Sequence, residues 1–222
     1  MQWLMLFGWG MLAIYGGQNH ARAAFVRCLM TAGLAVSMLS QLYLLWLDGL
    51  FSLATALPLH LCSLMGVLSV PLLWRAPSWL MEFSLLLGAP CAFLALCFPA
   101  ILTSPWPLLM SLSFYRLHVL IICVPLFCLR MGKPLPAKPQ RTFCIGNGYL
   151  LMVSLFNHFF LTNYLFLQRA PQGTPLAWLF LRGGAFYVCA LELLCMLLML
   201  WLAYGYRRMA ALRTSFLIAK ST

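Results

Sequence analysis

An all-α membrane protein, built as a bundle of seven transmembrane helices, is the fold class that the sequence predicts. Of its 222 residues, 64% are hydrophobic and only 8% are charged, and the mean hydropathy is +0.95. Soluble domains carry about 25% charged residues. No water-soluble core of this length could bury so much apolar surface, so the sequence indicates a chain whose solvent is a lipid bilayer.

Seven apolar runs are candidates for membrane spans, because about 17–25 apolar residues cross the hydrocarbon layer. The first run is short, and no Lys or Arg precedes it, so we expect a retained helix rather than a signal peptide. The last run is long enough to tilt or protrude. No internal repeat is visible, so we expect one integral membrane domain over 1–222, with spans near 1–16, 25–47, 57–74, 79–98, 107–129, 143–166 and 176–204.

The basic residues predict how the helices are oriented. Fourteen Lys and Arg stand against three acidic residues, a net charge of +11. Cytoplasmic connections are enriched in Lys and Arg. With the N-terminus outside and the C-terminus cytoplasmic, only Arg169 and Arg182 fall outside and Arg116 falls within a span. The remaining eleven fall inside: Arg22, Arg27, Arg75, Arg130, Lys133, Lys138, Arg141, Arg207, Arg208, Arg213 and Lys220.

This distribution also bounds location and partners. The cations lie between apolar runs, including the Pro-rich loop RMGKPLPAKPQR at 130–141, and form no basic face on a soluble module, so nucleic acid is excluded as a partner. Membrane lipids are the expected partners. We expect a multi-pass protein of the plasma membrane, which in a prokaryote is the inner membrane. The sequence leaves the oligomeric state open.

Polar side chains gather in the predicted outer half of four spans. The third span is expected to begin a helix near Pro58, which suits a first helical turn. Ionisable groups inside a membrane usually face the bundle interior or a water-filled cavity. The sequence therefore predicts a polar pocket open to the outside, contributed by Gln41, His60, Cys62, Arg116, His118, Asn157, His158, Thr162, Asn163 and Tyr164.

Several of these residues suit acyl chemistry. His60 and His118 are candidate acid/base groups, because an imidazole titrates at about pH 6.5. Asn163 is the candidate that stabilises an oxyanion, and Arg116 could hold an oxyanion or a headgroup. Tyr164, Gln41 and His158 are candidate substrate-binding residues. For His60 and His118 a purely structural role, a hydrogen bond to a neighbouring helix, is an equally open interpretation.

Cysteine and metal chemistry receive less support. Cys62 lies two residues from His60, so the two side chains point about 200° apart on a helix, and Cys62 would need His118 or His158 as a base. The nine cysteines form no CxxC pair. No HxxxH pair occurs and no carboxylate lies in the outer half. We therefore predict no metal site and no cofactor.

Three motifs carry a resemblance to a known family: LPLHLC at 57–62, the His118 of SFYRLH at 113–118, and TNYLFLQRAP at 162–171. The chain resembles the YwaF-like bacterial integral membrane proteins, which are grouped with the eukaryotic transmembrane protein one-six-four acyltransferases. The resemblance implies seven helices and acyl transfer onto lysophospholipids through a cysteine directly before the histidine. Leu59 stands at that position here, so the family's nucleophile is absent.

Three hypotheses follow. The first is an enzyme that transfers or hydrolyses lipid acyl groups, which predicts that His60 and His118 reach one shared cavity. The second is a protein that binds or transports a small or lipid-like anion, which predicts a path past Glu192 to the inner side. The third is a membrane assembly factor, in which the polar groups only tie helices together.

Overall fold

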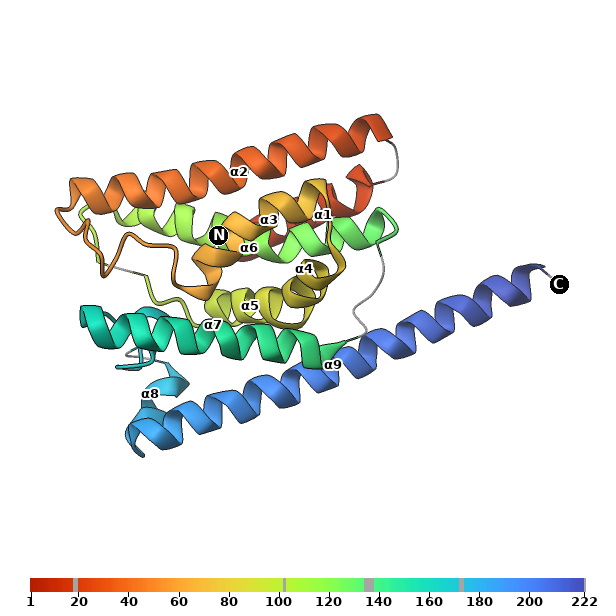
Figure 1. Ribbon diagram of the computed structural model, residues 1–222. Helices are drawn as coiled ribbons and strands as arrows, with labels where there is room; N and C mark the ends of the chain where they lie inside the picture. The colour runs from red at the N-terminus through yellow and green to blue at the C-terminus, as the bar shows by residue number, and fades with distance from the viewer. Residues whose placement is uncertain (18–19, 102, 134–137, 172–173, 222) are drawn as a thin grey trace.

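The regular elements of the structure, a computed structural model, are all helices in the part that it describes: residues 1–17, 20–101, 103–133, 138–171 and 174–221, with no side-chain description at 20, 175, 176 and 210–221. A π-helical turn, Ser84–Gly88, joins α4 to α5, and a 3-10 turn, Tyr164–Phe166, follows α7. The α-helices in chain order (Figure 1) are α1 (Gln2–Gly16), α2 (His20–Leu47), α3 (Leu61–Trp74), α4 (Ser78–Phe83), α5 (Ala89–Cys97), α6 (Pro107–Arg130), α7 (Pro139–Phe160), α8 (Pro175–Phe180) and α9 (Gly184–Ser221).

Five of the described helical segments are long and apolar enough to cross a membrane: Ala21–Leu47, Ser78–Cys97, Pro107–Arg130, Pro139–Phe160 and Gly184–Met209. The all-α, multi-pass architecture is therefore confirmed. Helices α1 and α3 have 15 and 14 residues. At 1.5 Å per residue they span about 21–23 Å, less than the roughly 30 Å of a hydrocarbon layer. Seven complete spans stay a prediction.

Three predicted boundaries differ from the structure. The third span was expected to begin a helix near Pro58, but α3 begins at Leu61, since His60 has extended dihedrals (φ −72, ψ 141). The sixth was expected to reach 166, but α7 ends at Phe160 because Leu161 adopts a left-handed conformation (φ 52). The seventh is divided into α8 and α9 at Gly183, whose φ is 112.

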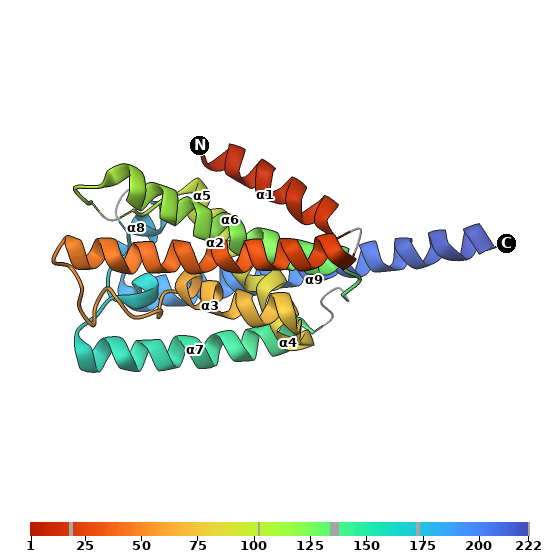
Figure 2. The same ribbon diagram turned by 90° about the horizontal axis from the view of Figure 1, so that it is seen from above.

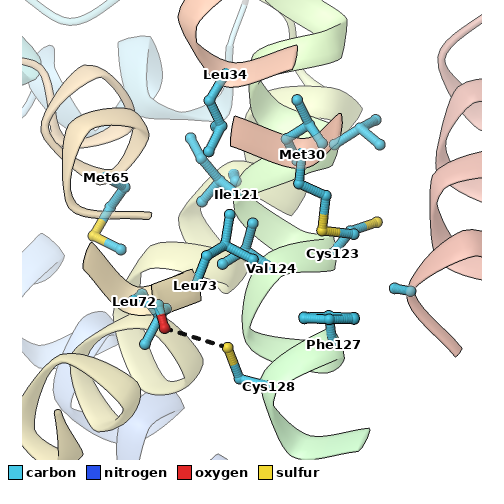
Figure 3. Packing of buried hydrophobic residues seen from close by; sticks show 14 of the residues in the cluster. Met30, Leu34, Met65, Leu72, Leu73, Ile121, Cys123, Val124, Phe127 and Cys128 are labelled. Carbon is cyan, nitrogen blue, oxygen red and sulfur yellow. Dashed lines mark hydrogen bonds between the residues drawn. The ribbon is translucent and has the colours of Figure 1, made fainter. Parts of the chain in front are cut away.

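The core forms where α2 and α3 pack against α6. Figure 3 shows Met30 and Leu34 facing Ile121 and Val124, all of them buried. Lipid is as apolar as these side chains, so close packing rather than water exclusion holds such helices together. Gly66 of α3 permits that approach, because a Cβ there would lie 2.9 Å from a methyl carbon of Leu117 and 3.0 Å from the sulfur of Met38.

The helices alternate in direction, so their connections meet at two ends. The α1–α2, α3–α4 and α6–α7 connections lie together at what we call the basic end (Figures 1 and 2). Arg75 follows α3, Arg130 closes α6 and Arg141 lies in the first turn of α7. The opposite end, the loop end, carries the described residues 48–60, 98–101, 103–106 and 161–171. That the basic end is cytoplasmic stays a prediction.

Some of the predicted cytoplasmic segments lie partly outside the described residues. Within the Pro-rich loop at 130–141, residues 134–137 lie outside the described residues. The side chains of Arg213 and Lys220 do as well. The helical backbone of α9 nevertheless continues beyond the ends of the other helices, as Figure 1 shows.

Helices α7 and α9 lie at the periphery. Figure 1 shows them side by side beneath the other helices. Only 11% of the spanning window of each is buried, compared with 61% for α6. The periphery therefore makes little apolar contact along its length, and polar contacts near its ends become important.

Candidate functional site

Asn157 organises the turn that follows α7 at the loop end. Its side chain is 1% exposed. Its Nδ2 donates to the Tyr164 carbonyl oxygen at 2.8 Å. Its Oδ1 accepts from the Thr162 hydroxyl at 2.7 Å and from the Tyr164 backbone N–H at 2.9 Å. These three hydrogen bonds close the turn, so Asn157, rather than its neighbour His158, is the structural residue of the pair.

Tyr164 joins the loop after α7 to the loop before α3. Its hydroxyl donates to the Leu53 carbonyl at 2.7 Å and accepts from the Leu57 N–H at 3.1 Å. The residue lies beyond the end of α7 and is fully buried, and this burial raises the pKa of its phenol above the usual value. The phenol therefore keeps its proton as a hydrogen-bond donor. Tyr149 of α7 adds another tie by donating to the Leu59 carbonyl at 2.8 Å.

His60 lies inside this joined pair of loops. Its ring centroid is 5.1 Å from that of Tyr164 and 5.1 Å from that of Phe166. The side chain is half-buried. Among the described residues neither ring nitrogen makes a hydrogen bond. Neither nitrogen is one of the fully buried polar atoms that lack a partner in the described structure. The imidazole is thus positioned by aromatic contacts, while its nitrogens stay free to react.

Backbone strain is concentrated beside His60. Of the four described non-glycine residues with positive φ, three lie in this turn: Leu161, Leu165 and Phe166, with φ angles of 52°, 57° and 56°. Each such conformation costs about 1–3 kcal/mol and is retained at functional sites more often than elsewhere. The contacts of Asn157 and Tyr164 hold this strained turn in place beside His60.

His118 has a different environment. It is 4% exposed, and its Nδ1 lies 2.7 Å from the Phe114 carbonyl oxygen of its own helix. A carbonyl accepts only, so Nδ1 carries the proton and Nε2 is left as an acceptor. Gly66 lies beside Leu117. Counting from that contact, His60 lies about 10 Å nearer the loop end than His118 along the helix axes. The two histidines therefore have separate neighbours, so an enzyme mechanism can use only one of them as its acid/base group rather than the pair expected from the sequence.

The other predicted loop-end residues fall into two groups. Asn163 is engaged within its own turn, since its Oδ1 accepts from the N–H groups of Gln168 and Arg169 at 2.9 and 3.0 Å and its Nδ2 donates to the Arg169 carbonyl at 2.9 Å. His158 is exposed and touches only the ring of Phe159 among the described contacts. Cys62 is a half-buried free thiol in the first turn of α3.

A second polar group lies between α2 and α6, and we call it the α2–α6 seam: Ser37, Ser40 and Gln41 of α2 with Ser113 and Arg116 of α6. The Nε of Arg116 donates to the Ser37 hydroxyl at 2.8 Å. One turn nearer the loop end, the hydroxyls of Ser40 and Ser113 are 2.7 Å apart. Sequence reasoning found Arg116 and Gln41 but missed the serines. Ser37 and Ser40 are spaced i, i+3 on α2, as are Ser113 and Arg116 on α6, so each of these pairs shares a helix face.

An ion pair at the basic end was also not predicted. In the structure Glu82 is 7% exposed and its carboxylate lies 2.7 Å from Nη2 of Arg141, so α4 is tied to α7. Arg141 also donates to the Ser78 hydroxyl at 3.4 Å. These partners are 59 residues apart in the chain, and no local pattern in the sequence could have paired them.

The predicted site residues do not line either of two hollows of the described structure. One, of about 350 Å³, lies among α5, α6 and α9 and is lined by apolar side chains such as Phe93, Ile122 and Leu198, together with Tyr206. The other follows α9 between Trp201 and Met209. Within the described residues, no group of three His, Cys, Asp or Glu is placed to hold a metal ion.

Comparison with known proteins gives the family. No curated protein and no solved structure matches the chain. The model of the TMEM164 family matches residues 1–203, nearly the full length. This match agrees with the apolar helices that make the chain a multi-pass membrane protein. The chain belongs to the TMEM164 family.

Proposed function

We propose that this protein is a membrane enzyme that transfers or hydrolyses acyl groups of lipids, with His60 as its acid/base group. The observation that carries the proposal is the environment of His60: a half-buried imidazole between two aromatic rings, with no hydrogen-bond partner among the described residues. A structural histidine in a membrane protein normally bonds a neighbouring helix. His118 makes a hydrogen bond, to a carbonyl of its own helix, whereas His60 makes none among the described residues.

The resemblance noted for LPLHLC adds the class of substrate. It implies acyl transfer onto lysophospholipids, and it places the reactive histidine at His60. Because Leu59 replaces the cysteine of that motif, the reaction proposed here has no acyl-enzyme intermediate. Direct transfer from one lipid to another is the simplest mechanism left.

In that mechanism His60 acts first as a base. It takes the proton from the hydroxyl of a lysophospholipid, or from water, and the oxygen attacks the ester carbonyl of a second lipid. When the tetrahedral intermediate collapses, the C–O bond of the donor ester breaks and the imidazolium returns its proton to the departing oxygen. Asn163 has one amide hydrogen beyond its bond to Arg169, and this is the candidate donor to the oxyanion.

The test uses purified full-length protein in vesicles that contain phosphatidylcholine and an isotopically labelled lysophospholipid. Transfer gives labelled diacyl phospholipid, and hydrolysis gives free fatty acid, both measured by mass spectrometry. His60→Ala is expected to lower the rate by about 100-fold or more, the usual contribution of general acid–base catalysis. His158→Ala is the matched control, because it removes an exposed histidine from the same end of the protein.

The outcomes separate the hypotheses. Loss of activity in His60→Ala but not in His158→Ala supports the proposal. Activity that survives His60→Ala and is abolished by His118→Ala would move the chemistry to α6. Acyl chemistry is excluded if three results coincide. Neither product forms, the lipid species of a deletion strain are unchanged, and His60→Ala and His118→Ala both rescue that strain fully. Binding or transport of a lipid-like anion is then the leading hypothesis, because Arg116 favours an anionic ligand.

A further inference from the structure

We propose that Arg116 and the α2–α6 seam form a binding site for the phosphate group of a membrane phospholipid. The site is separate from His60, and it does not depend on whether the protein catalyses acyl chemistry. The proposal rests on the position of Arg116, on the absence of a protein counter-charge near it, and on which hydrogen-bonding groups of the seam remain unused.

Arg116 lies well inside the bundle. It is nine residues beyond Pro107, where α6 begins, so its Cα lies about 14 Å from the loop end of the helix. Ser37 is ten residues before Leu47, the last residue of α2, which gives about the same depth. The hydrogen bond between the two side chains confirms that the depths match. A charged side chain near the centre of a membrane helix costs about 2.5–3.5 kcal/mol by insertion measurements.

No acidic residue of the described structure offsets this charge. The chain contains only three: Asp48, Glu82 and Glu192. Glu82 is paired with Arg141 at the basic end. Asp48 lies just beyond the end of α2, eleven residues from Ser37, which is about 16 Å along the axis. Among the described residues Arg116 makes no ion pair, and its two terminal nitrogens make no hydrogen bond.

Among the described residues the hydrogen-bond pattern of the seam leaves mainly donors unused, because the Gln41 amide offers two donor hydrogens beside its one acceptor oxygen. The hydroxyl of Ser37 donates its one proton to the Gly33 carbonyl, at 2.7 Å, and so accepts from Arg116. The Ser40 and Ser113 hydroxyls bond each other. The N–H groups at the tip of Arg116 remain, as does the side chain of Gln41, for which no hydrogen bond is found. A ligand that matches this set accepts hydrogen bonds and carries negative charge.

A phospholipid phosphate meets both requirements and is present at the right place. Helical side chains lean toward the N-terminus of their helix, so Arg116 extends toward the loop end. Long basic side chains bring their charge closer to the headgroup layer in this way. Ser113, Ser40 and Gln41 lie one turn closer to that end and keep the route polar. The guanidinium is half-buried, so a lipid can reach it. Its planar fork binds phosphate oxygens in pairs.

The experiment measures lipid binding to the full-length protein in detergent by native mass spectrometry. The protein is titrated with phosphatidylglycerol and, separately, with diacylglycerol of the same acyl chains. Arg116→Gln is expected to weaken phosphatidylglycerol binding by about tenfold or more, the usual value of a charge-assisted hydrogen bond. Diacylglycerol binding is expected to be the same in both proteins. Arg182→Gln, which removes an exposed charge near the loop end, is expected to change binding less than about twofold.

Two further arms keep the proposal falsifiable. Gln41→Ala keeps the charge and is expected to weaken phosphatidylglycerol binding several-fold; it also serves if Arg116→Gln fails to fold. Inorganic phosphate in excess is expected not to displace the lipid. Equal binding by the wild type, Arg116→Gln and Gln41→Ala would overturn the proposal. Displacement by inorganic phosphate would assign the site to a soluble anion instead of a lipid. Neither of these two outcomes bears on the His60 proposal.

Discussion

Helix α6 and helix α7 are both long apolar helices, yet they are held in the fold in opposite ways. Of the spanning window of α6, 61% is buried; for α7 the figure is 11%. Helix α6 packs along its length against α2 and α3, with small residues such as Gly66 allowing close approach. Helix α7 is attached by polar contacts at three levels: Arg141 with Glu82 at the basic end, Tyr149 with Leu59 near the middle of the helix, and Asn157 with the turn at the loop end.

The difference assigns roles to the polar residues. In the α7 region, the buried groups of Asn157, Tyr164 and Glu82 are paired and replace part of the apolar contact that the helix lacks. In the α6 region packing already supplies stability, so the charge of Arg116 has no structural partner to explain it. On the proposals made above, polar residues that look alike in the sequence divide into structural and functional ones according to how well their helix is packed. Three substitutions test this division.

Asn157→Ala is expected to have the largest effect. It removes the acceptor of the buried Tyr164 N–H together with two other hydrogen bonds, so the free energy of unfolding should fall by about 2–4 kcal/mol. Thermal unfolding in detergent measures the change. The neighbouring His158→Ala, on the exposed face, should stay within about 0.5 kcal/mol of the wild type. Equal losses in the two variants would show that burial does not separate these residues.

Glu82→Gln is expected to have an intermediate effect. It leaves Arg141 without its counter-charge, but the arginine side chain is 36% exposed, so the loss should be about 1–2 kcal/mol rather than that of a fully buried pair. Glu192→Gln is the control, since it removes an acidic residue from α9 that makes no ion pair in the described structure. Thermal unfolding again measures the change. A loss in Glu192→Gln as large as that in Glu82→Gln would contradict the end-attachment of α7.

Tyr164→Phe is expected to have the smallest effect on stability, about 1 kcal/mol, because the ring stays packed and only the hydroxyl is lost. Its local effect should be clearer. Without the bonds to Leu53 and Leu57, residues 48–60 should be cleaved faster in limited proteolysis, whereas cleavage at 98–106 should keep its rate. Unchanged cleavage at both loops would mean that the Tyr164 hydroxyl does not hold them together.

Much of the fold could be predicted from the sequence because lipid imposes simple rules. Run length and hydropathy located the helices, and the positions of Arg75, Arg130 and Arg141 predicted connections that do meet at one end. The errors lie at helix ends. Pro58 suggested a first helical turn, but the chain before Leu61 is held in turns by contacts with Tyr164, and these come from a segment 107 residues away.

The candidate site was harder to predict for the same reason. Depth could be counted along each helix, and in the structure His60 lies at the loop end, before α3, while Arg116 and His118 lie near the middle of α6. Depth does not give direction around the bundle axis. His118 turns to its own helix, Arg116 to α2 and His60 to the loop after α7. To predict a pocket shared by His60 and His118, one needs the direction in which each side chain points around the bundle axis, and depth along a helix does not give it.

The π-helical turn Ser84–Gly88 has a consequence for how the chain can change in length. Such a turn accommodates one residue more than a regular α-helix, and one residue corresponds to a rotation of about 100°. Glu82 before the turn faces α7, while Ala92 and Leu96 after it are fully buried in the core. Deleting any one residue between 84 and 88 would rotate one side against the other. Insertions and deletions here should therefore be selected against more strongly than substitutions.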